Sequence, residues 1–291
     1  MGLFDNINLN SVLNTAKDIL NSDAAKQVIN AVNSSSAAGG NVDIASGLKA
    51  ALKVGIETAA KNLGQTDGYL ADAAVKIGLP KEALTTFGAV QSLSQNAAFS
   101  SLLNSAGVNI PDSNTITTLF NRAAENAAPK SIDVFVNAIT GMSIDDAKNI
   151  LFGQDNAATS YLKSNTYTQL QSAFMPSITD SLNTIKVANV TPTQAWSTYA
   201  TYNNKLVEML NSSAVKFGLE VARKSGVLKD SYFESLSSID MVNTNLSDYI
   251  TGKALDGLFL KVSDKEYDIR HNATARVSDV LQNVFGLLDK K

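Results

Sequence analysis

Residues 44–63 read IASGLKAALKVGIETAAKNL, and within them an apolar side chain recurs with nearly every helical turn. The recurring positions are Ile44, Leu48, Leu52, Ile56 and Leu63. Lysine and glutamate occupy mostly other positions, namely Lys49, Lys53, Glu57 and Lys61. Spacings of four and seven residues place side chains on one face of an α-helix. The stretch therefore predicts an amphipathic helix that buries its apolar face.

Signals for helix starts and ends recur along the rest of the chain. Pro80 and Pro129 precede helix-forming segments, where the missing N–H of proline does no harm because it would be unpaired anyway. Three segments resemble capping boxes, in which two side chains satisfy free amides. They are residues 143–146, 166–169 and 191–194. Gly153 and Gly286 mark helix ends, where a left-handed residue is tolerated.

No long run of alternating apolar and polar residues indicates a β-strand. The sequence therefore predicts an all-α fold, a single compact multi-helix domain of about ten helices. This domain is expected to occupy residues 41–291. Residues 1–40 are predicted to form a leader, with an amphipathic helical segment over 10–32 and a flexible linker rich in Ser, Ala and Gly.

The amino-acid composition of the chain argues against several classes of function. The chain of 291 residues has a formal charge of −3, which gives no electrostatic reason to expect nucleic-acid binding. It has no cysteine and one histidine, His271, so disulfides, thiolate nucleophiles and sites with two imidazoles are excluded. No stretch has the roughly 18 uninterrupted apolar residues that span a bilayer. The start of the chain has neither a basic nor an apolar segment typical of a secretion signal.

Motifs for catalysis are equally scarce. The chain contains no nucleophile elbow and no glycine-rich phosphate loop, and the sequence indicates no cofactor and no metal site. Carboxylates remain as candidates for acid and base chemistry. Asp256 lies beside apolar residues, and if it is buried it needs a partner, for which Arg270 or Arg276 is expected. These residues favour a structural ion-pair network over an active site.

Several motifs together carry a family resemblance. They read NRAAENAAP at 121–129, MSIDDA at 142–147, DNAATSY at 155–161 and YITGKALDGLF at 249–259, followed by Arg270 and Arg276. Over roughly residues 45–288 the chain resembles the bacterial family Domain of Unknown Function 4197, which is all-helical and has no established activity. The resemblance implies an envelope protein, located in the periplasm if a signal was removed and in the cytoplasm as the chain is written.

The resemblance also implies that eight residues share one feature, either a buried polar network or a ligand cleft. They are Arg122, Glu125, Asp146, Thr159, Tyr161, Asp256, Arg270 and Arg276.

Three hypotheses about function follow. The first is a non-enzymatic binding protein that holds a protein partner or an apolar small molecule in a groove between helices. The second is a structural or assembly subunit that self-associates through its N-terminal helix. The third is a hydrolase or lyase that uses Glu125, Asp146 and Asp256.

Overall fold

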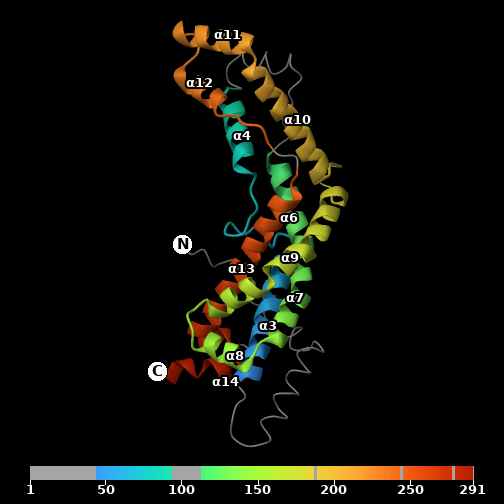
Figure 1. The fold of residues 1–291 in the computed structure, drawn as a ribbon, viewed down its shortest axis with the longest axis vertical. Helices are drawn as coiled ribbons and strands as arrows, with labels where there is room; N and C mark the ends of the chain where they lie inside the picture. Colours follow the sequence, from blue (N-terminus) through green and yellow to red (C-terminus); the bar gives the residue numbers. More distant parts are fainter. Residues whose placement is uncertain (1–43, 94–112, 187–188, 243–244, 277–278, 291) are drawn as a thin grey trace, which may run out of the picture. The chain divides into compact units, whose positions relative to one another are not determined.

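The computed structural model describes residues 44–93, 113–186, 189–242, 245–276 and 279–290 (Figure 1). Eleven α-helices are formed by these described residues. They are α3 (Ile44–Leu63), α4 (Lys81–Leu93), α6 (Ser113–Ala127), α7 (Ser131–Gly141), α8 (Ile144–Leu151), α9 (Ala157–Thr184), α10 (Pro192–Asn211), α11 (Ser213–Lys224), α12 (Asp230–Ser237), α13 (Ser247–His271) and α14 (Asp279–Phe285). Three short 3-10 helices are η1 (Ala128–Lys130), η2 (Ala273–Ala275) and η3 (Leu288–Lys290).

The all-α class is confirmed, since no β-strand occurs in the described ranges. Two predicted capping boxes are confirmed in full. Ser143 caps α8 together with Asp146, and Thr191 caps α10 together with Gln194. In each box the hydroxyl oxygen accepts a hydrogen bond from the amide three residues later, whose side chain accepts from the first residue in return. The predicted leader and linker over residues 1–40 lie outside the described residues.

The capping box at residues 166–169 is wrong. Thr166 lies within α9, which runs without interruption from Ala157 to Thr184. Its buried hydroxyl donates a hydrogen bond to the carbonyl of Leu162, one turn earlier, at 2.7 Å. A threonine caps a helix only when its own backbone is extended. The apolar spacing of Leu162, Leu170 and Phe174, all buried, keeps the helix intact through this position.

The described residues group into two compact units, each assembled from segments distant in sequence. We call unit 1 the described residues up to Val75 together with 125–174 and from Ala254 onward. Unit 2 comprises Lys76–Ala124 and Met175–Lys253. The helices α6, α9 and α13 contribute residues to both units.

Unit 1 is built around α3, which contacts α7, α8 and α14 (Figure 1). The predicted apolar stripe of α3 is buried, with Leu48, Leu52 and Ile56 each less than a tenth exposed. Gly47 lies where α14 comes closest, because a β-carbon there would lie 2.3 Å from Cγ2 of Val284. The stripe is therefore the centre of the unit 1 core.

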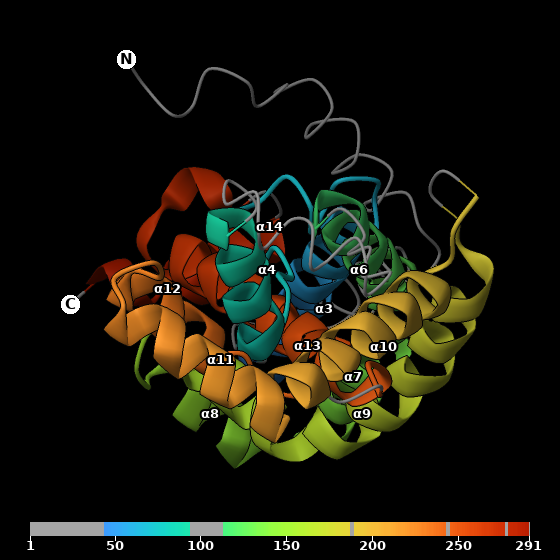
Figure 2. The same cartoon turned by 90° about the horizontal axis from the view of Figure 1, so that it is seen from above.

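Unit 2 has an aromatic centre. The ring of Trp196 on α10 lies 5.9 Å from that of Phe120 and 5.0 Å from that of Tyr199. The helix α4 packs against α12, and α11 contacts both α10 and α12 (Figure 2). A second apolar cluster joins α10 to α12 and the residues after it. Its buried members are Leu206, Val207, Leu210, Leu236 and Ile239.

The close approach at Gly47 predicts opposite effects for two glycines of α3. Gly47→Ala should destabilise the protein by about 1–3 kcal/mol, because Val284 is β-branched and cannot rotate away freely. Gly55→Ala places its β-carbon 3.6 Å from Cδ1 of Ile269, an ordinary contact. It should stabilise the helix by up to about 1 kcal/mol. Urea unfolding followed by circular dichroism compares the two, and equal shifts would contradict the packing described.

Candidate functional site

The buried carboxylate of Glu266 on α13 caps the N-terminus of α9. Glu266 Oε1 accepts a hydrogen bond from the amide of Ala158 at 2.8 Å, and its Oε2 accepts from the amide of Thr159 at 2.8 Å. The Thr159 hydroxyl also donates to Oε2 at 2.8 Å. These amides belong to the first turn of α9, where no carbonyl of the same helix can receive them. A negative charge is also favourable at this end of a helix.

Arg270 completes the same contact from one turn further along α13. Its Nε and Nη2 atoms donate to Glu266 Oε1 at 3.0 and 2.8 Å. Its Nη1 and Nη2 atoms also donate to the carbonyls of Leu151 and Ile150 at 2.9 and 2.7 Å, at the end of α8. The ion pair therefore binds two free amides at the start of α9 and two carbonyls at the end of α8 together.

Arg276 closes the end of α13 in a similar way. Its Nε donates to the carbonyl of Ile269 at 2.8 Å, and its Nη2 donates to the carbonyl of Arg270 at 2.9 Å. Asp289 in η3 accepts from both terminal nitrogens of Arg276. The hydrogen bonds between the two side chains and the opposite charge of each partner raise the pKa of Arg276 and lower the pKa of Asp289.

Arg270 or Arg276 is expected to pair with Asp256 only if Asp256 is buried, and it is exposed. Arg270 pairs with Glu266 and Arg276 with Asp289. Thr159 and Arg270 both donate to Glu266, and Arg276 donates to the carbonyl of Arg270. Asp256 is a surface residue because its position on α13 faces solvent, between the buried Leu255 and Gly257.

Glu125 makes a separate buried contact at the end of α6. Its Oε1 accepts hydrogen bonds from the amides of Tyr69 and Leu70, at 3.2 and 3.3 Å. The Tyr69 hydroxyl in turn donates to the carbonyl of Ala254 at 2.8 Å. Burial raises the pKa of the Tyr69 hydroxyl, and the negative charge of Glu125 raises it further. Gly257 leaves room for this tyrosine, since a β-carbon there would lie 2.9 Å from Cε1 of the ring.

Three further predicted residues lie elsewhere. Asp146 caps α8, and the hydrogen bonds from the Ser143 hydroxyl and amide lower its pKa. Tyr161 is half-buried on α9, where burial and the charge of Asp146 raise its pKa. Arg122 is half-buried in the part of α6 that belongs to unit 2.

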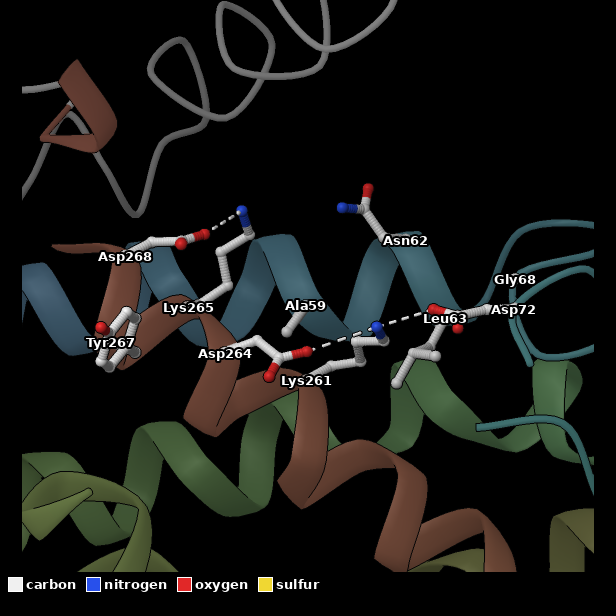
Figure 3. Close-up of a pocket in the computed structure, with 10 residues that line it drawn as sticks. All are labelled: Ala59, Asn62, Leu63, Gly68, Asp72, Lys261, Asp264, Lys265, Tyr267 and Asp268. Carbon is white, nitrogen blue, oxygen red and sulfur yellow. Dashed lines mark hydrogen bonds and ion pairs between the residues drawn. The ribbon is translucent and has the colours of Figure 1, made fainter. Parts of the chain in front are cut away.

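A polar groove of about 570 Å³ lies in unit 1 between α3, the turn after it and α13 (Figure 3). Lys261 bridges Asp72 at 2.6 Å and Asp264 at 3.3 Å, and Lys265 bridges Asp268 at 3.4 Å. Burial alone would lower the pKa of Lys261, but the bonds and charge of Asp72 and Asp264 raise it. The lysine is thus held protonated, which leaves it a poor nucleophile or base.

His271 has a partner that the sequence did not reveal. Its Nε2 atom lies 2.7 Å from Oδ1 of Asp155, in the turn before α9, and its ring lies 4.5 Å from that of Tyr267. Both His271 and Asp155 are exposed. The pair tethers the end of α13 to the turn between α8 and α9, on the surface.

A groove of about 330 Å³ with a mixed lining lies in unit 2 between α10, α11 and α12. Its apolar lining consists of Val207, Leu210, Leu219, Phe233, Leu236 and Ile239. Polar side chains of the lining include Lys216, Glu220 and Asp240. Arg223 lies over the ring of Phe233 at 5.2 Å and pairs with Glu220 and Asp230 at 3.2 and 3.5 Å. It thereby links α11 to α12 beside the groove.

Comparison with known proteins gives one family. Residues 39–286 match the family described as Protein of unknown function (DUF4197). The chain belongs to this family. No curated protein and no solved structure matches it significantly. Membership in DUF4197 confirms the resemblance drawn from the motifs, and it brings no activity with it.

Two surveys of the described ranges add to this picture. No group of three or more His, Asp or Glu side chains in these ranges is arranged to hold a metal ion. None of the helices formed there is long and apolar enough to cross a bilayer.

Two residues of this DUF4197 protein that organise their surroundings lie outside the eight that the resemblance implied. Glu266 is the centre of the network in unit 1. Asn121 holds unit 2 residue Ile77 from both sides, accepting from its amide at 2.9 Å and donating to its carbonyl at 2.9 Å. Asn121 stands in the NRAAENAAP motif, which pointed to it. Glu266 was visible only as a residue four positions before Arg270, a spacing that suits an ion pair on one helix.

Removing one partner of the buried ion pair should be costly. Glu266→Gln is expected to destabilise the protein by about 3 kcal/mol or more, because Arg270 stays buried without a counter-charge and the new amide faces other donors. Asp268→Asn, a change at a half-exposed carboxylate on the same helix, should cost less than about 1 kcal/mol. Urea unfolding measures both, and a small effect of Glu266→Gln would show that the network is not structural.

The ion pair of Asp72 predicts a dependence of stability on pH. Burial would raise the pKa of Asp72, but the hydrogen bonds from Lys261 and Ala74 and the charge of Lys261 lower it overall. Its contribution is therefore present above about pH 3.9, the value of a free Asp, and is lost as pH falls through the folded pKa. Asp72→Asn should lower stability by less than about 1 kcal/mol at pH 7. Unfolding midpoints at pH 7 and pH 3 test this, and an equal loss at both would contradict it.

Proposed function

We propose that this DUF4197 protein is a non-enzymatic binding protein that holds apolar side chains of a partner protein in the groove between α10, α11 and α12. The observation that carries the proposal is the composition of this groove. Its lining combines six aliphatic or aromatic side chains with five polar ones, among them Lys216 and Asp240. Binding grooves typically combine apolar walls with polar groups that orient the occupant.

The size of the groove favours a segment of protein over a large cofactor. About 330 Å³ is at the lower end of the range for ligand sites, and it accommodates one or two apolar side chains. Each such side chain gains about 1.5–3 kcal/mol when it leaves water. An amphipathic segment that inserts several side chains, with its polar face toward Lys216 and Glu220, is a common occupant of a groove between helices.

The alternative of a carboxylate-dependent hydrolase or lyase has less support. Glu125 and Glu266 are committed to backbone amides, and Asp146 caps a helix. Asp256 is exposed on α13. Each of these carboxylates therefore has a role in the fold or lies at the surface. The association with the bacterial envelope stays part of the proposal, on the family resemblance.

An apolar fluorescent probe tests the groove directly. We expect the full chain to bind N-phenyl-1-naphthylamine saturably at one site. Leu219→Gln should weaken binding about tenfold, because it replaces an apolar wall with an amide. Leu260→Gln makes the same change at an exposed position of α13 and should leave binding unaltered. Equal binding by the two variants and the parent would refute the groove as the site.

Native mass spectrometry of the purified chain, followed by denaturation, identifies what the groove holds. A peptide released from the parent protein and lost in Leu219→Gln supports a protein partner. A released lipid or small molecule would assign the groove to an apolar ligand. A change in oligomeric mass on deletion of residues 1–40 would favour the assembly role.

A further inference from the structure

The helix α11 presents a second apolar face, which differs from the face that lines the groove. No residue of α11 is buried. Val215 and Leu219 are half-buried against the cluster of α10 and α12. Phe217 and Val221, one turn apart, point elsewhere because each residue of a helix turns by 100°. Phe217 is 73% exposed and Val221 is 50% exposed.

This exposed face continues beyond the two large side chains. Ala214 lies three residues before Phe217, and Gly218 lies three residues before Val221, so both share the face, and both are exposed. A β-carbon added at Gly218 would meet nothing within 4 Å. Val227, in the turn after α11, is 79% exposed. Among the residues that the structure describes, none therefore covers the stripe along α11.

Basic side chains surround the stripe, although the chain as a whole is acidic. Residues 213–230 contain four basic residues, Lys216, Arg223, Lys224 and Lys229, and two acidic ones, Glu220 and Asp230, whereas the full chain has a net charge of −3. Arg223 pairs with both acidic residues, and Lys224 also lies 3.9 Å from Glu220. Lys216, Lys224 and Lys229 are exposed. The region is thus a positive island around exposed Phe and Val side chains.

We propose that α11 contacts an anionic lipid surface. A helix with an apolar face and lysines beside it lies in the interface of a bilayer, with the apolar side chains among the acyl chains and the ammonium groups at the lipid phosphates. Phe217, Val221 and Val227 supply the apolar contact. Lys216, Lys224 and Lys229 supply the attraction to negative headgroups, which adds to it.

A second copy of the chain fits the same face less well. One stripe on a helix of 12 residues buries much less than the roughly 1,200 Å² of a stable protein interface. A second copy would also bring the same basic side chains toward each other, whereas an anionic surface neutralises them. The inference concerns the exposed face of α11, which shares only Lys216 with the lining of the groove.

Sedimentation with vesicles tests this surface in the full chain. We expect binding to vesicles of phosphatidylcholine and phosphatidylglycerol in equal parts, weak binding to phosphatidylcholine alone, and release by salt, because screening weakens the attraction. Phe217→Ser should lower binding about tenfold, and Lys224→Glu with Lys229→Glu should lower it at least as much. Phe152→Ser, which removes an exposed aromatic ring in unit 1, should leave binding unaltered.

Other results would overturn the proposal. If Phe217→Ser binds the mixed vesicles as well as the parent protein does, the lipid contact lies outside α11. If binding is equal with and without the anionic lipid, the lysines do not contribute to it. Sedimentation velocity of the protein alone provides the third measurement. A dimer that Phe217→Ser dissociates would assign this face to a second copy. Circular dichroism of each variant verifies that the helices are intact.

Discussion

Glu266 and Arg270 bring two opposite charges into unit 1 with only 3% of each side chain exposed. Burying such charges is unfavourable unless each receives its full set of hydrogen bonds. Here the carboxylate accepts from two amides, a hydroxyl and the guanidinium, while the guanidinium also donates to two carbonyls. All three amide and hydroxyl donors and both carbonyls belong to helix ends. The pair is therefore stable only when α8, α9 and α13 are in place together.

This coupling explains why the polar residues of the family motifs serve the fold. DNAATSY begins α9 and supplies the amides that Glu266 receives. NRAAENAAP supplies Asn121 and Glu125, which hold the backbone of Ile77 and of the turn at Tyr69. YITGKALDGLF supplies Gly257, which leaves room for the Tyr69 ring. Each motif thus holds an irregular connection to a helix, where backbone groups have no partners of their own.

Much of the fold could be predicted from the sequence, because helix stripes and caps are local patterns. The stripe at Leu48, Leu52 and Ile56 and the boxes at Ser143 and Thr191 are confirmed. The box at Thr166 failed because the pattern does not reveal whether the backbone is extended there. The exposure of Asp256 could not be predicted, because its apolar neighbours did not reveal which side of α13 faces solvent. Glu266 was overlooked as the centre, since its amide partners on α9 lie 107 and 108 positions away.

The chain has one tryptophan and one histidine, and they lie in different units. Trp196 is buried beside Phe120 and Tyr199 in unit 2, and His271 stands at the end of α13 in unit 1. Indole fluorescence therefore reports on unit 2 alone, while the imidazole proton resonances report on unit 1 alone. The protein carries an intrinsic spectroscopic marker in each unit, so the unfolding of one can be followed independently of the other without any label.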